Sequence, residues 1–74
     1  MDTYWQTADR TPQVLIDEAS ATVTYVGYSH TGNATSAGKW LIKKVSVSGN
    51  VTTTQWASEE ANQIWDNRAS LSYS

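Results

Sequence analysis

The side chains that could carry out acid–base chemistry are few in this 74-residue sequence. Carboxylates occur as two adjacent pairs, Asp17-Glu18 and Glu59-Glu60. Neighbouring residues of a strand point to opposite faces, so the first pair does not converge on one substrate. The second pair suits the first turn of a helix, where the helix dipole favours anions. Neither pair predicts a general acid and base, and we expect the chain not to be an enzyme.

Metal-binding and nucleophilic side chains are scarcer still. The chain has no cysteine and a single histidine, His30, inside the polar segment 29–38. This composition excludes thiolate and all-histidine metal sites within one chain, and nothing around His30 resembles a nucleophile elbow. His30 is therefore interpreted as a solvated loop residue. We predict no catalytic site, no metal and no cofactor.

Three lysines near a tryptophan are the only pattern that could bind a nucleic acid. Lys39, Lys43 and Lys44 flank Trp40, and single strands are held by such a combination of charge and stacking. The formal net charge of −2, however, lacks the basic character of nucleic-acid-binding domains. Solvated lysines at a sheet edge are the preferred interpretation, and no nucleic-acid partner is expected.

Aromatic residues are the strongest compositional signal. Four tryptophans and four tyrosines stand against no phenylalanine. Such rings, with a polar edge, suit half-buried surfaces and interfaces. A chain of this size buries only about 60% of its unfolded surface, so the excess of rings predicts a homo-oligomer. Rings could instead stack on sugars, an alternative that requires two or more of them on one open face.

Targeting and membrane signals are not evident. No apolar run approaches the roughly 20 residues of a membrane span, and the N-terminal residues lack a basic segment followed by an apolar one. We expect no membrane segment, and synthesis in the cytoplasm without export.

The element most clearly predicted is a β-hairpin over residues 39–56. Its arms are rich in β-branched and aromatic residues, and Ser48-Gly49-Asn50 reads as a three-residue loop. In that register Val47 faces Val51, and Ile42 lies opposite Trp56.

The first arm of this hairpin has an irregular apolar pattern. Trp40 and Ile42 fall on one face, whereas Val45 and Val47 fall on the other. Either both faces are buried, or a bulge at Lys43-Lys44 resets the alternation, and the bulge is slightly favoured.

Shorter elements flank the hairpin. Residues 13–18 and 21–28 are predicted strands, and Gly27 suggests a bulge or bend near the end of the second. A helix is predicted over roughly residues 59–66. The alternation of apolar residues with serines over residues 69–74 predicts a last strand.

These elements predict a mainly β fold, a small antiparallel sheet or partly open barrel of four to five strands with one short helix before the last strand. Residues 1–12 are interpreted as an N-terminal arm and residues 13–74 as a single domain. Large apolar side chains and one arginine at the final corner are the core candidates: Val23, Tyr25, Trp40, Ile42, Trp56, Trp65, Arg68, Leu71 and Tyr73. Aromatic residues of the arm and valines of the second hairpin face are the interface candidates: Tyr4, Trp5, Val45 and Val47.

Several segments together form a recognisable pattern: Ala34-Thr35-Ser36-Ala37 followed by Trp40-Leu41-Ile42-Lys43-Lys44, then Thr53-Thr54-Gln55-Trp56-Ala57, and the ending Trp65-Asp66-Asn67-Arg68-Ala69-Ser70-Leu71-Ser72-Tyr73-Ser74. In these segments the chain resembles small conserved proteins encoded by tailed-bacteriophage genomes. With Tyr25-Val26-Gly27 at its start, the pattern covers residues 25–74. The acidic stretch that family members carry between the last two tryptophans is shortened here to Ser58–Ile64.

The resemblance implies a virion protein and supplies no catalytic residues. The implied function is that of a structural component of the tail, baseplate or fibre-attachment region, assembled in the host bacterial cytoplasm. Its partners would be further copies of itself and other virion proteins. A capsid decoration or head-fibre protein is one alternative. A small carbohydrate-binding module, which would bind a host-surface glycan, is another.

Overall fold

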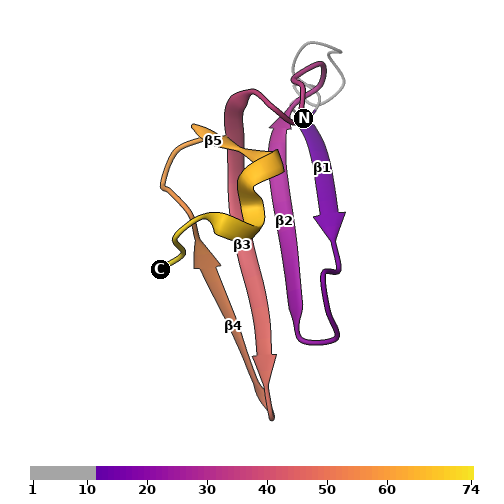
Figure 1. Ribbon diagram of the computed structural model, residues 1–74, viewed down its shortest axis with the longest axis vertical. Helices are drawn as coiled ribbons and strands as arrows, with labels where there is room; N and C mark the ends of the chain where they lie inside the picture. The colour runs from indigo at the N-terminus through magenta and orange to yellow at the C-terminus, as the bar shows by residue number, and fades with distance from the viewer. Residues whose placement is uncertain (1–11) are drawn as a thin grey trace, which may run out of the picture.

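The fold is an open antiparallel sheet in which each strand follows its neighbour along the chain (Figure 1). A computed structural model describes residues 12–74. The sheet order is β1-β2-β3-β4, and its bounds are β1 (Pro12–Asp17), β2 (Val23–His30), β3 (Gly38–Ser48) and β4 (Val51–Trp56). The short β5 (Gln63–Ile64) pairs with the first residues of β3. The predicted mainly β class and antiparallel sheet of four to five strands are confirmed, and the sheet does not close into a barrel.

The β3–β4 hairpin turns through two residues rather than the three predicted. Ser48 pairs with Val51, so the loop is Gly49-Asn50. Gly49 has a φ of 61°, and a glycine at the first central position of a two-residue hairpin is typical of a type II′ turn. The predicted register is therefore wrong by one residue, and Lys43, not Ile42, lies opposite Trp56.

Alternation runs along β3 without the bulge predicted at Lys43-Lys44. Val26 pairs with Lys43 and Tyr25 with Lys44, and the register stays constant from Val23 to Tyr28 of β2. Because side chains alternate on a regular strand, Val45 and Val47 lie on the face opposite Trp40 and Ile42. The irregularity of β3 lies earlier, between Gly38 and Trp40, where β5 pairs with it.

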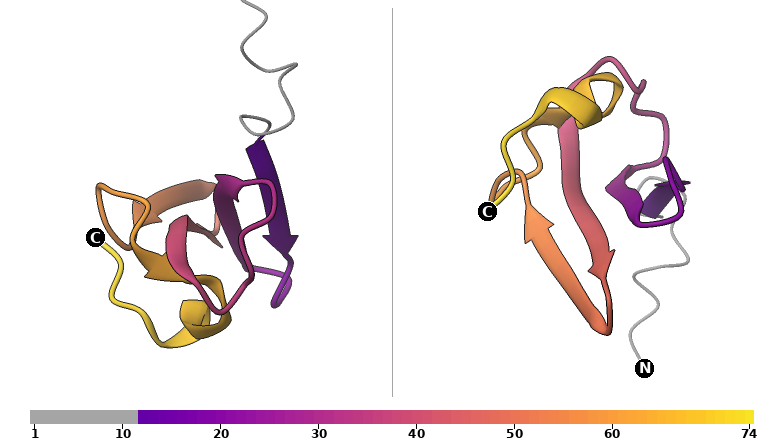
Figure 2. Two further views of the ribbon diagram at one scale, coloured as in Figure 1. Left: turned by 90° about the horizontal axis from the view of Figure 1, so that it is seen from above. Right: turned by 60° about the horizontal axis from the view of Figure 1, so that its bottom comes forward.

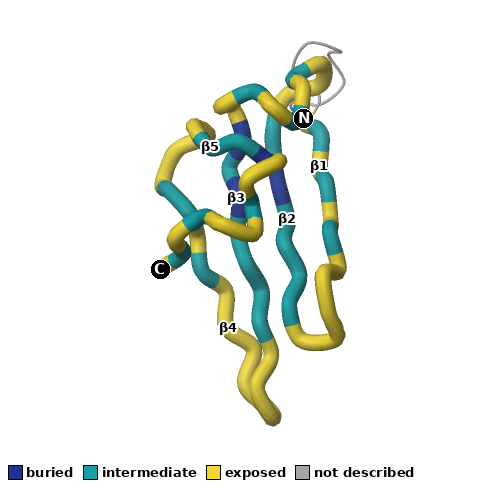
Figure 3. The backbone as a smooth tube through the Cα atoms, in the orientation of Figure 1, coloured by how far each residue is buried: buried dark blue, intermediate teal, exposed yellow. Residues whose placement is uncertain are grey.

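The core is small and lies on one face of the sheet. Trp40 and Ile42 are fully buried, and Trp65 is 6% exposed (Figure 3). Partly buried residues surround these three, namely Leu15, Tyr25, Ala57, Leu71 and Tyr73. The indole Nε1 of Trp40 donates to the backbone oxygen of Ala34, which ties the polar 29–38 loop to the core. The core prediction is thus confirmed for Trp40, Ile42 and Trp65.

Gly27 makes room for an indole ring and forms no bulge. Its partners Leu15 on β1 and Ile42 on β3 follow the regular register of their strands. A Cβ at this position would lie 2.5 Å from Cε3 of Trp65 and 3.2 Å from Cε3 of Trp40. The absent side chain therefore lets Trp65 lie directly on β2.

The C-terminal residues cover this face as a 3-10 helix and an extended tail. Residues 58–62 are irregular, and the helix is η3 (Trp65–Ser70), so the helix predicted over 59–66 is wrong in position. The strand predicted over residues 69–74 is also wrong, although Leu71 and Tyr73 do face the core. The end of the C-terminal tail is bound to β4 by two backbone hydrogen bonds between Trp56 and Ser74.

Arg68 links η3 to the first strand. Its Nε donates to Oδ2 of Asp17 at 2.8 Å, its Nη1 donates to the backbone oxygen of Trp65, and its guanidinium lies 4.6 Å from the centre of the Trp65 ring. The Tyr73 hydroxyl donates to the backbone oxygen of Arg68 at 2.7 Å. Burial, reinforced by Tyr25, raises the pKa of Tyr73 to about 12, while the charge of Arg68 opposes the shift. Arg68 is half-buried and belongs to the structural framework, as predicted.

Candidate functional site

The second face of the sheet carries an apolar surface that we call the open face. Pairing and alternation assign it the even-numbered residues of β1, β2 and β4 and the odd-numbered residues of β3. The other face is the core face, because Leu15 of β1, Gly27 of β2 and Ile42 of β3 lie against the core. The members of the open face are Val14, Ile16, Thr24, Val26, Tyr28, Leu41, Lys43, Val45, Val47, Thr52, Thr54 and Trp56.

Within residues 12–74, no helix or strand packs on the open face. Figure 2 shows η3 and the C-terminal tail together on the opposite side of the sheet. Four large apolar side chains of the open face remain exposed, with exposed fractions of 65% for Ile16, 48% for Val14, 41% for Val47 and 38% for Trp56. These four residues lie on β1, β3 and β4, and half-buried apolar residues of the same face lie on β2 and β3. Isolated exposed apolar residues are common, but several on one uncovered face are typical of an interaction surface.

A cation lies close to two neighbouring rings on the open face. Nζ of Lys43 is 5.6 Å from the centre of the Tyr28 ring and 5.5 Å from that of Trp56. The two ring centres are 6.3 Å apart, with the planes at 31°. Tyr28 and Trp56 belong to the strands on either side of β3, which carries Lys43. The arrangement combines apolar contact area with one positive charge.

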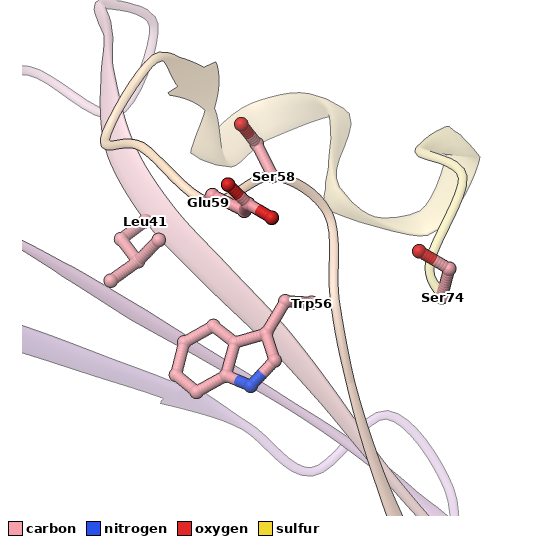
Figure 4. Close-up of a pocket in the computed structure, with 5 residues that line it drawn as sticks. All are labelled: Leu41, Trp56, Ser58, Glu59 and Ser74. Carbon is pink, nitrogen blue, oxygen red and sulfur yellow. The ribbon is translucent and has the colours of Figure 1, made fainter.

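A hollow adjoins the open face where β4 ends. It has a volume of about 480 Å³ and is lined by side chains from three segments, namely Leu41, Trp56, Ser58, Glu59 and Ser74. Figure 4 shows Ser58 and Glu59 across the hollow from the Trp56 indole. The hollow therefore offers a ring, a carboxylate and two hydroxyl groups.

Two of the four predicted interface residues belong to the open face. Val45 is half-buried and Val47 is 41% exposed there, whereas Tyr4 and Trp5 lie outside the described residues. Trp56 is not the core residue that the sequence predicted. Because it pairs with Lys43 rather than Ile42, its side chain points away from the core.

Sequence reasoning missed most of the open face. Val14 and Ile16 flank Leu15 in an apolar run that was assigned to a strand without assigning its two faces. Val26 and Tyr28 lie on the same face of β2 as Thr24. The bulge or bend suggested at Gly27 left the face of Tyr28 undecided. Strict alternation through Gly27 was the signal that could have found them.

Clusters of metal-binding side chains and membrane-spanning helices were sought among the described residues. No three His, Asp or Glu side chains of residues 12–74 lie close enough together to hold a metal ion. His30 is exposed at the end of β2. Among the same residues, no helix has the length and apolar character needed to cross a bilayer.

Comparisons with protein-family models, with curated proteins and with solved structures gave no significant match for this chain.

Proposed function

We propose that this protein is a non-catalytic structural component of a tailed-bacteriophage particle, which acts by binding copies of itself and neighbouring particle proteins. The observation that carries the proposal is the apolar open face, which extends over four strands. Only three residues of the described part of the chain are buried apolar residues, so much of its apolar surface lies outside the core. The sequence resemblance described above supports the assignment to a phage particle.

The free energy available from covering the open face is large for a domain of this size. Fully burying one Val or Ile side chain contributes about 1.5–3 kcal/mol, and Val14, Ile16 and Val47 are all at least 41% exposed. Small domains are stable by only about 5–15 kcal/mol, so covering a few such residues changes the balance appreciably. Covering these side chains would therefore favour association through this face, against the entropy lost when two copies associate.

The free edge of the sheet adds a second mode of contact. β1 pairs with β2 on one side, and no described strand pairs with its other side. Edge strands with exposed β-branched residues, such as Val14 and Ile16, readily pair with another chain. Sheet extension and face packing together suit a repetitive assembly.

The test of the proposal is the presence of the protein in purified particles. Mass spectrometry of banded particles should detect the chain in a fixed number of copies, and gold-labelled antibody should place it in the tail, baseplate or fibre-attachment region. Label on the capsid would instead support a decoration or head-fibre protein. Absence of the chain from particles produced by cells that express it would contradict the proposal.

A second candidate function is favoured by Tyr28 and Trp56. Their rings lie on one open face, beside a hollow with the carboxylate of Glu59 and two serine hydroxyls, which are groups that sugars bind. A small carbohydrate-binding module would use such a surface to hold a host-surface glycan. Glycan-array binding by wild-type protein that is lost in Trp56→Ala would support this function, and an array without signal would exclude it for the glycans printed.

A further inference from the structure

The charges on the open face disfavour packing of that face against itself. Lys43 lies in the middle of it, between Val26 on β2 and Trp56 on β4. Two identical faces packed about a central two-fold axis would bring the Lys43 ammonium groups close together, and like charges at an interface are unfavourable. The occupant should instead be apolar and acidic.

The N-terminal segment of the chain has this composition. Residues 1–11 contain two neighbouring aromatic residues, Tyr4 and Trp5, with Asp2 and Asp9 on either side of them and Arg10 near β1. Tryptophan and tyrosine are the side chains most often responsible for binding energy at interfaces. The two acids complement Lys43.

The length of this segment matches the face. Seven peptide units separate Trp5 from Pro12, the first residue of β1, and they span up to about 23 Å when extended. Three strand spacings of about 4.8 Å make the open face only about 14 Å wide. The segment is therefore long enough to extend across the width of an open face.

We propose that the open face binds residues 1–11 of a second copy of this chain, with Trp5 on the apolar surface and the acids near Lys43. This inference rests on the proposed function, because it identifies the segment through which copies associate. Exchange of a terminal segment between identical chains gives each copy one donated and one accepted contact.

Cysteine cross-linking tests the proposal directly, because the chain contains no cysteine of its own. One protein carries Gln6→Cys and a second, of different mass through isotope labelling, carries Thr54→Cys on the open face. Thr53→Cys is the matched control, because Thr53 is also exposed but points to the other side of β4. After mixing and mild oxidation, mass spectrometry should find the mixed disulfide with Thr54→Cys and several-fold less of it with Thr53→Cys. Equal cross-linking with Thr54→Cys and Thr53→Cys would overturn the proposal. A further protein carries both Gln6→Cys and Thr54→Cys, and a disulfide that forms only within single chains of this protein would also overturn it.

A second pair of variants separates failure of this inference from failure of the proposed function. Light scattering should show that Trp5→Ser and Ile16→Lys each abolish association, while an equimolar mixture of the two forms a heterodimer through the one intact segment and the one intact face. If Trp5→Ser associates like the wild type while Ile16→Lys does not, residues 1–11 are not the occupant and only this inference falls. If the wild-type chain is monomeric, the self-association that the proposed function requires is contradicted as well.

Discussion

Lys43 lies opposite Trp56 in the β3–β4 ladder, with its Nζ 5.5 Å from the centre of the indole ring. This pairing directs Trp56 away from Trp40 and Ile42 and makes it part of the open face. A cation–π contact at an exposed site contributes about 0.5–1 kcal/mol. The pairing therefore shapes the interaction surface more than it stabilises the fold.

Replacing Lys43 should have a small effect on folding. Lys43→Met keeps the aliphatic stem and removes the charge, so we expect a loss of at most about 1 kcal/mol in the free energy of unfolding, measured by urea denaturation. Lys39→Met is the matched control, because Lys39 is exposed and makes no ring contact within the described residues. A loss of several kcal/mol for Lys43→Met would contradict the placement of this residue outside the core.

Gly27 should not tolerate a methyl group. In Gly27→Ala the new Cβ would meet the Trp65 ring at 2.5 Å, and such overpacking costs about 1–3 kcal/mol. For a domain of this size, each kcal/mol corresponds to a fall of about 4–8 °C in Tm. In Gly38→Ala the nearest atom is the backbone oxygen of Asn62 at 3.6 Å, an ordinary contact, so Tm should change little. Thermal melts with equal shifts in the two variants would show that Trp65 does not lie on β2.

Arg68 and Asp17 should be coupled, but weakly. Their side chains are 28% and 33% exposed, and solvent screening reduces the contribution of such an ion pair to about 1 kcal/mol or less. Arg68→Ala should cost more than Asp17→Asn, because it also removes the contacts with the ring and the carbonyl oxygen of Trp65. A double-mutant cycle by urea unfolding measures the coupling. Zero coupling energy would contradict the link between η3 and β1.

Stability should fall at high pH because of Tyr73. Its pKa is about 12 in the folded protein, against about 10 in an unfolded chain. Between these two values the unfolded chain releases the proton and the folded chain keeps it, so rising pH favours unfolding. Below pH 10 the hydroxyl is neutral in both states, and this contribution does not vary with pH.

Tyr73→Phe provides the comparison for this pH dependence. The variant should lose the part of the decline between about pH 10 and about pH 12 that belongs to Tyr73, as measured by urea unfolding at several pH values. Absorbance titration of the folded wild type should show one of its four tyrosines ionising last. Identical pH dependence in both proteins would show that burial does not raise the pKa of Tyr73.

The general fold was predictable because alternation and turn residues are local signals. Strands β1 to β4 lie within one or two residues of their predicted bounds. The face of Trp56 was not predicted correctly, because a loop one residue shorter reverses every side chain of the following strand. Gly49 as the first residue of a two-residue turn was the local signal that could have decided the register.

The C-terminal elements depend on tertiary contacts that a local pattern does not contain. Ile64 pairs with Gly38 instead of continuing a helix, and Trp65 begins η3 where it covers Gly27. Leu71 and Tyr73 alternate as in a strand, but β4 and β5 already pair with the side of β3 that β2 leaves free. Leu71 and Tyr73 pack on the core face instead, and the segment bonds to β4 at its end, where Ser74 and Trp56 exchange two backbone hydrogen bonds.

The claim that the open face is an association surface is tested most directly by sedimentation equilibrium of Ile16→Lys and Val51→Lys. Both residues are β-branched and almost equally exposed, at 65% and 63%, but only Ile16 belongs to the open face. We predict that the wild type and Val51→Lys associate with the same affinity, while Ile16→Lys remains monomeric with an unchanged circular dichroism spectrum. A monomeric wild type, or equal association in the two lysine variants, would contradict the claim.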